Sequence, residues 1–282
     1  MNNLPRRLVP AAIAATIIGA CPAAAAPASG KIVLAPHRAI YNLKLLRAGR
    51  TGGIDSVRGR IVYDFSGSAC EGYALRLRQM SELVSGEGDV LSDLRSTTWE
   101  DNAAKRFRFN SENLVNEKRT DAVDGHADRT PAAVRVTLDR PETKRFSAPA
   151  AAVFPTEHTR RIIAAARAGK SILTFPVYDG SDNGEKIYDT ITVIGKPIVK
   201  PAADASAKIS ALSGLTRWPV SIGYFEKESA ALEHSGEQTP VYSISFELYE
   251  NGVSRALVLG YKDFTLEGDL TGLEMKKPKA CK

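Results

Sequence analysis

Apolar and polar residues alternate with a period of two along much of this chain. The clearest stretch is 242–248, Tyr-Ser-Ile-Ser-Phe-Glu-Leu, in which every second residue is apolar and those between are polar. Such alternation places one row of side chains in a core and the other in water, which predicts a half-buried strand. Asn251-Gly252 is a strong hairpin signal, and 257–259 and 264–266 continue the pattern. The C-terminal part of the chain is therefore predicted to be an antiparallel meander.

Earlier parts of the chain repeat the same alternation over short stretches. These stretches are 39–45, 57–65, 73–77, 107–109, 134–138, 173–177 and 187–194. Many strands joined by local turns favour a large all-β barrel, or a sheet curled upon itself, over a layered α/β fold.

One segment, 156–168, has the period of an amphipathic helix instead. Thr156 is its expected N-cap, and Gly169 is a natural residue to end it. A single helix in a β protein usually covers an open end of the barrel, so its apolar face should shield an apolar interior. The residues of that face are Ile162, Ile163 and Ala166.

The N-terminal residues have the order of a secretory signal. Arg6 and Arg7 supply positive charge, residues 8–20 are apolar apart from one proline, and small residues occupy 21–26. This order is typical of a signal peptide and predicts cleavage after Ala25, since the apolar run is too short for a comfortable membrane span.

Two alternatives to a cleaved signal stay open. The segment could be a buried N-terminal helix, or Ile18-Gly19-Ala20-Cys21 could be a lipobox that attaches a lipid to Cys21. We expect residues 1–25 to be the signal peptide and 26–282 to form a single all-β domain in the periplasm. No later segment is apolar enough to cross a bilayer as a helix.

The cysteine count predicts one disulfide. Of three cysteines, Cys21 lies in the expected signal, which leaves Cys70 and Cys281. Two cysteines of an exported chain usually pair because their compartment is oxidising. Two free thiols or a bridge between chains are the alternatives. We expect the bond to fasten a C-terminus that would otherwise fray.

Charge argues against a nucleic-acid binder. Without residues 1–25 the chain has 36 basic and 32 acidic residues, and the two signs are interspersed. Nucleic-acid binders concentrate their basic residues, and here only 276–279 does so, at what we interpret as a solvated tail.

Catalytic and metal-binding motifs are mostly missing from the sequence. Ser181-Asp182-Asn183 matches one element of penicillin-binding enzymes, but the Ser-x-x-Lys and Lys-Thr-Gly elements of that chemistry are missing, so we interpret it as a turn. Glu100 beside Trp99 is expected on a solvated face. The histidines are far apart in sequence: His37, His126, His158 and His234. We expect no enzyme, no cofactor and no metal site, although a triad assembled by folding stays an alternative.

Several short motifs stand out in combination: 36–41, 67–73, 92–95, 98–100, 154–158, 177–181, 250–254 and 261–264. Together they resemble the EipB-like cell-envelope integrity proteins of Gram-negative bacteria. The resemblance implies a periplasmic, spiral-like and incompletely closed antiparallel barrel with one disulfide, Cys70 to Cys281. It also implies a role in maintaining the envelope, together with a periplasmic tetratricopeptide-repeat partner, and no catalytic residues.

Two classes of function follow from these observations. The first is a non-enzymatic protein that acts through a protein partner on its surface or strand edges. The second is a carrier that holds a lipid or a lipoprotein acyl chain in the barrel interior.

Overall fold

A single antiparallel sheet of fourteen strands makes up most of the described chain. The computed structural model describes residues 32–49, 53–202, 209–226, 239–278 and 280–281 of the 282-residue chain. The expected signal segment and His234 lie outside these residues, so the division into a signal and one domain stays a prediction. The strands are β1 (His37–Ala48), β2 (Ile54–Ser68), β3 (Gly72–Ser85), β4 (Val90–Glu100), β5 (Arg106–Val115), β6 (Lys118–Arg129), β7 (Ala133–Arg140), β8 (Lys144–Pro149), β9 (Ile172–Val177), β10 (Tyr188–Ile194), β11 (Arg217–Glu226), β12 (Tyr242–Tyr249), β13 (Ser254–Gly260) and β14 (Phe264–Met275).

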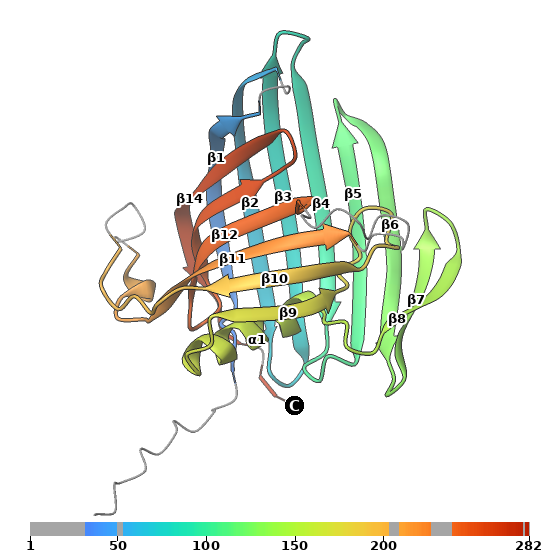
Figure 1. The fold of residues 1–282 in the computed structure, drawn as a ribbon, viewed down its shortest axis with the longest axis vertical. Coiled ribbons are helices and arrows are strands. Elements are labelled where there is room, and N and C mark those ends of the chain that lie inside the picture. The colour runs from blue at the N-terminus through green and yellow to red at the C-terminus, as the bar shows by residue number, and fades with distance from the viewer. Residues whose placement is uncertain (1–31, 50–52, 203–208, 227–238, 279, 282) are drawn as a thin grey trace, which may run out of the picture. The chain divides into compact units, whose positions relative to one another are not determined.

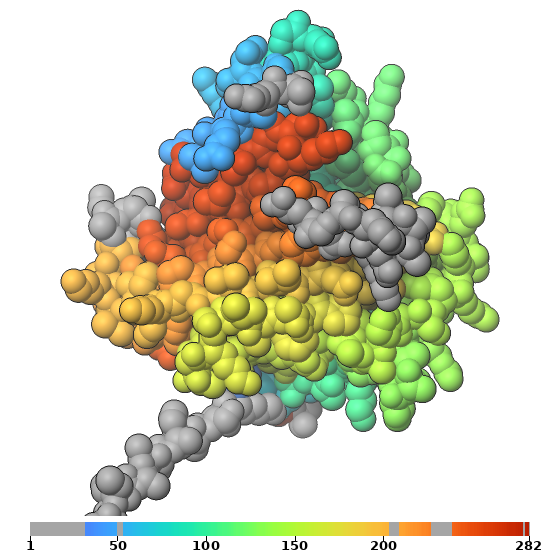
Figure 2. Space-filling model, in the orientation of Figure 1, coloured from blue at the N-terminus to red at the C-terminus, as the bar shows by residue number. Residues whose placement is uncertain are grey.

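The strand order explains how the sheet curls. It runs β8-β7-β6-β5-β4-β3-β2-β1-β14-β13-β12-β11-β10-β9, so that two meanders are joined where β1 pairs with β14. β9 to β12 (yellow to orange) cross in front of the strands β1 to β4 (blue to teal) (Figure 1). Where this front face is visible in the space-filling view, side chains fill the spaces between β9, β10 and β11 (Figure 2).

The two edges of the sheet, β8 and β9, are consecutive in the chain and nearly meet. Val153, just after β8, donates its N–H to the carbonyl of Pro176 at 2.8 Å, and Tyr178 donates its N–H to the carbonyl of Val153 at 3.0 Å. This short parallel bridge draws the end of β9 to the chain that leaves β8. The sheet is therefore an incompletely closed, spiral-like barrel, as predicted.

Helix α1 (Pro155–Arg167) connects β8 to β9 and is the one α-helix among the described residues, beside a short 3-10 turn at Ser210–Leu212. The predicted helix, 156–168, differs from it by one residue at each end. No helix in the described part of the chain is long and apolar enough to span a bilayer.

Alternation between buried and exposed residues is strict in β10 and weak in β12. In β10 the inward residues are buried and the outward ones exposed, residue by residue. In β12 the outward Ser245 and Glu247 are only half-exposed. Ser245 shares a hydrogen bond of 2.8 Å with Ser221, and the Glu247 carboxylate is bound by Arg217 and Arg255 on the neighbouring strands. Cross-strand pairs of this kind shield the outer face of β12 from water.

The predicted disulfide between Cys70 and Cys281 is confirmed, with the two Cα atoms 5.5 Å apart and 211 residues between them in the sequence. Cys70 lies in the turn from β2 to β3, and Cys281 lies in the tail that follows β14. The same tail is fixed where Lys276 donates its N–H to the carbonyl of Pro36 at 2.8 Å. The bond therefore ties the last strand to a turn two strands away in the sheet.

Replacing both cysteines, Cys70→Ser with Cys281→Ser, should lower the free energy of unfolding by about 2–5 kcal/mol. The bond restricts a very long loop in the unfolded chain, and losing that restriction favours unfolding. Urea titration measures the change, and wild-type protein unfolded under reducing conditions is the control, with an expected midpoint equal to that of the double variant. Equal stability of the oxidised wild type and the variant would contradict a stabilising role.

Candidate functional site

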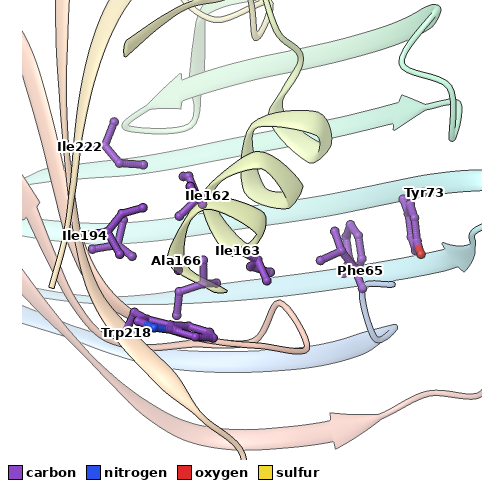
Figure 3. Packing of buried hydrophobic residues seen from close by; sticks show 12 residues of the cluster. Phe65, Tyr73, Ile162, Ile163, Ala166, Ile194, Trp218 and Ile222 are labelled. Carbon is purple, nitrogen blue, oxygen red and sulfur yellow. The ribbon is translucent and has the colours of Figure 1, made fainter. Parts of the chain in front are cut away.

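The predicted apolar face of the helix packs inside the curled sheet. Ile162 and Ile163 are 2% and 0% exposed, and Ala166 is also buried. They share one core cluster with side chains from both meanders: Phe65 of β2, Tyr73 of β3, Ile194 of β10, and Trp218 and Ile222 of β11. Figure 3 shows the helix between the strands that carry these residues. The helix therefore fills the interior at this end of the sheet and contacts both halves.

A carboxylate from β4 caps the start of the helix. Glu100 accepts the N–H of Thr156 and the N–H of Glu157, each at 2.8 Å. These are two of the N–H groups at a helix start that have no partner within the helix, and the helix dipole favours a negative charge there. Arg160 adds an ion pair to the same carboxylate at 3.7 Å.

Two expectations about these residues are therefore wrong. Thr156 lies inside the helix, and the N-cap residue is Phe154, whose side chain makes no capping bond. Glu100 is 2% exposed and not on a solvated face. The capping role of Glu100 is not evident from the sequence, because its partners come from a distant segment. β4 continues through Trp99 to Glu100, and the alternation places the Glu100 side chain on the inner side, where the N–H groups at the helix start bind it.

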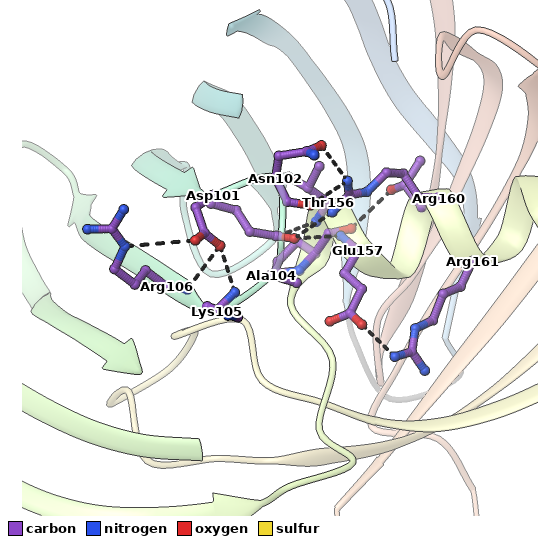
Figure 4. Close-up of polar contacts among 12 residues, drawn as sticks. Asp101, Asn102, Ala104, Lys105, Arg106, Thr156, Glu157, Arg160 and Arg161 are labelled. Carbon is purple, nitrogen blue, oxygen red and sulfur yellow. Dashed lines mark hydrogen bonds and ion pairs between the residues drawn. The ribbon is translucent and has the colours of Figure 1, made fainter. Parts of the chain in front are cut away.

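Two arginines, Arg160 and Arg129, connect the helix to the chain around it, and a third, Arg161, forms an ion pair within the helix. Arg160 donates to the carbonyl of Asn102 at 2.9 Å, and Arg129 donates to the carboxylate of Glu157 at 2.8 Å. Arg161 binds the same carboxylate at 2.5 Å. Figure 4 shows the contacts of Arg160 and Arg161 around the first turns of the helix. Partly buried, multiply bonded ion pairs of this kind fix a helix in one orientation more firmly than single surface pairs do.

Burial shifts the pKa values of the titratable groups in this region. Burial raises the pKa of Glu100 to about 7, against the N–H donors and Arg160, which favour the charged form. Burial lowers the pKa of His158 to about 4, and the positive charge of Arg161 acts in the same direction. His158 is thus neutral near pH 7. Its ring lies edge-on to Phe175, and its Nε2 is 3.4 Å from the hydroxyl of Thr192.

The structure does not bring the described histidines together. His37 bonds the carbonyl of Ala35 at 2.8 Å and stacks on Tyr63. His126 lies on the outer side of β6, whereas His158 lies on the buried side of α1. Across the residues that the structure describes, no group of three or more His, Cys, Asp or Glu side chains is placed to hold a metal ion. The chemistry at this end of the sheet is that of packing and capping.

The pH dependence of stability should reveal the buried His158. Its imidazole has an ordinary pKa of 6.5 when unfolded and about 4 when folded, so the unfolded chain takes up a proton first as the pH falls. Stability that is fully present above pH 6.5 should be lost towards pH 4, by up to about 3 kcal/mol. Glu100 has the opposite sign, because its raised pKa favours the folded state as the pH falls from 7 to 4.5.

Comparison of wild type with His158→Gln separates the two effects, since Glu100 is common to both. Urea titrations from pH 7 to 4.5 should show the free energy of unfolding of the variant rising relative to that of the wild type, because the loss from His158 is removed and the gain from Glu100 stays. His126→Gln, at a half-exposed position on the outer face, is the control and should follow the wild type. A variant profile identical to that of the wild type would contradict a neutral, buried His158.

Comparison with known proteins places the chain in a family. A sequence model of the EipB-like family matches residues 28–277. The cell envelope integrity protein EipB of Brucella abortus (strain 2308) is 34% identical over 271 residues, which cover 95% of this chain and 94% of that protein. A solved structure, a β-barrel-like protein of a domain of unknown function from Brucella abortus, aligns with a TM-score of 0.79 at 33% identity, over 86% of this chain and 99% of its own. The chain therefore belongs to the EipB-like family.

Proposed function

We propose that this protein maintains the integrity of a bacterial cell envelope, and that it acts by binding a protein partner and not by catalysis. The observation that carries the proposal is the 34% identity, along almost the whole chain, to a protein named for cell envelope integrity. Identity spread over 95% of the chain supports a shared role more strongly than a shared fold alone would.

The disulfide supports a periplasmic location. A bond between Cys70 and Cys281 persists in an oxidising compartment and is rare in a reducing one. The expected signal at 1–25 agrees with export, and attachment through a lipid on Cys21 is the alternative. Either form would place the folded sheet in the space between the membranes.

The pairing of two carboxylates supports a non-enzymatic role. Glu100 is buried and is used in capping α1, and the partly exposed Glu247 is used in binding Arg217 and Arg255. A catalytic group needs to be free to react with a substrate, whereas these carboxylates are engaged by their own partners. The partner that the family resemblance implies, a tetratricopeptide-repeat protein, would then bind the outer surface.

One observation favours the alternative, a carrier of a lipid or acyl chain. The inner face of β10 to β14 carries a row of aromatic rings in mutual contact, with centroids 4.8–6.0 Å apart. These rings are Tyr188, Tyr224, Tyr242, Tyr261 and Phe264, and all but Tyr188 are only partly buried. A partly open aromatic row is a surface on which an apolar chain can bind.

Deleting the gene in its host should sensitise cells to detergent and to cell-wall antibiotics, and the wild-type gene should restore resistance. Native mass spectrometry of the protein purified from its own periplasm then separates the two candidates. We expect a complex with a protein partner, whose mass survives replacement of Tyr242 by Ala. Lipid adducts lost in Tyr242→Ala would favour the carrier, and unchanged resistance of the deletion strain would overturn both.

A further inference from the structure

The outer face of β1 to β7 contains two neighbouring hollows. One has a volume of about 500 Å³ and lies over Trp99, and the other has a volume of about 420 Å³ and lies over Arg76 and Arg78. Thr97 and Asn110 line both, so the two hollows adjoin on this face. Each is within the range of small-ligand sites, about 300–1,000 Å³. We call this feature the outer groove.

One end of the outer groove is basic. Arg38, Arg76, Arg78 and Arg95 line it, against the carboxylates of Asp64 and Glu112. Asp64 is bound by Lys276, and Glu112 is bound by Arg95 at 3.2 Å.

The four arginines at this end are of two kinds, one pair bound by a carboxylate and one pair free of ion pairs with the described residues. Arg78 and Arg95 are fixed by Asp93, which lies beside them on the same face of the sheet and whose buried carboxylate both of them bind at 2.7–2.8 Å. Hydrogen bonds from Arg78 lower the pKa of Asp93 to about 2, so the carboxylate stays charged. Arg38 and Arg76 are exposed and form no ion pair with any residue that the structure describes. Guanidinium groups of this kind match phosphate and carboxylate groups in shape and charge.

The other end of the outer groove is mixed in charge and contains an aromatic ring. The guanidinium carbons of Arg106 and Arg108 lie 5.6 and 5.9 Å from the centre of the Trp99 ring. Three carboxylates share this hollow with them: Asp124, Asp128 and Asp139. A site with close donors and acceptors around an indole suits a ligand with hydroxyl groups that donate and accept, and with C–H groups that contact the part of the ring that lines the hollow beside the two arginines.

We propose that the outer groove binds an anionic oligosaccharide, with its phosphate at the arginine end and a neutral sugar ring beside Trp99. The segregation of charge along the groove carries this inference. A partner that is negative along its whole length, such as a nucleic acid, an acidic peptide or an anionic bilayer, would meet the carboxylates at the Trp99 end. A sugar chain with one charged end meets opposite charge at one end and hydrogen-bonding groups at the other.

Two ligands are titrated into the mature protein by isothermal calorimetry: mannopentaose that carries a terminal 6-phosphate, and neutral mannopentaose. We expect the phosphorylated sugar to bind at least about tenfold more tightly than the neutral one. Arg38→Ser with Arg76→Ser should remove most of that difference, because these arginines have no competing ion pair. Trp99→Ala should weaken binding of the phosphorylated sugar about tenfold as well, because the contact between the sugar and the indole is lost.

Arg145→Ser is the matched control, since Arg145 is an exposed arginine of β8 that lines neither hollow. It should bind like the wild type, and circular dichroism should show that all variants stay folded. Loss of affinity in Arg145→Ser equal to that in the groove variants would overturn the proposal. So would a missing effect of Trp99→Ala, undetectable binding of the phosphorylated sugar, or equal affinity for inorganic phosphate, poly-glutamate or phosphatidylglycerol vesicles.

Discussion

The contact of helix α1 with both halves of the sheet is the interaction on which the rest of the structure depends. A sheet of fourteen strands in one continuous order has two edges, and here they are consecutive in the chain, β8 and β9. Ile162 and Ile163 pack against residues of both meanders, so the curl of the sheet and the position of the helix stabilise each other. The hydrogen bond from the N–H of Val153 to the carbonyl of Pro176 then brings the two edges together. The gap that remains between them lies beside the helix.

Polar groups complete the same arrangement without adding reactive chemistry. Glu100 satisfies the start of α1 from another strand, and His158 is packed as a neutral ring. Two N–H bonds and Arg160 offset only part of the cost of burying the Glu100 charge, and the pKa of Glu100 is therefore raised to about 7. Because the interior at this end is filled, the features suited to recognition lie elsewhere, on the aromatic inner row of β10 to β14 and in the outer groove.

Most of the strands that the sequence predicts have inner rows that are large and apolar, although β11, whose inner row includes Trp218 and Ile222, was not predicted as a separate stretch. The alternation at 187–194 and 242–248 corresponds to β10 and β12, and the cysteine count found the disulfide. β6 was missed because its inner row is small, including Gly125, where an added Cβ would lie 2.6 Å from the carbonyl oxygen of Thr137 and 2.8 Å from the ring of Phe109. The space available to an inner side chain is set by residues of the neighbouring strands. The sequence of one strand alone does not reveal these neighbours.

The candidate sites follow the same rule. The helix face was predicted because its residues are neighbours in the sequence, whereas its cap comes from Glu100, 56 residues before Thr156. The residues of the outer groove are brought together by the pairing of the strands. Asp64, Arg76, Thr97 and Asn110 lie opposite one another on four adjacent strands. Only the pairs 76 with 78 and 106 with 108, two arginines on one face of a strand, hint at it in the sequence.

Native-state hydrogen exchange of the α1 amides tests most directly whether the helix is a fixed part of the core. The structure predicts that the amides of Ile162 and Ile163 exchange only with unfolding of the whole sheet, with the same opening free energy as those of Val220 and Ile222. If the α1 amides instead open at a much lower free energy while β11 stays protected, the helix is a movable cover, and the account of a sheet held by its helix is contradicted.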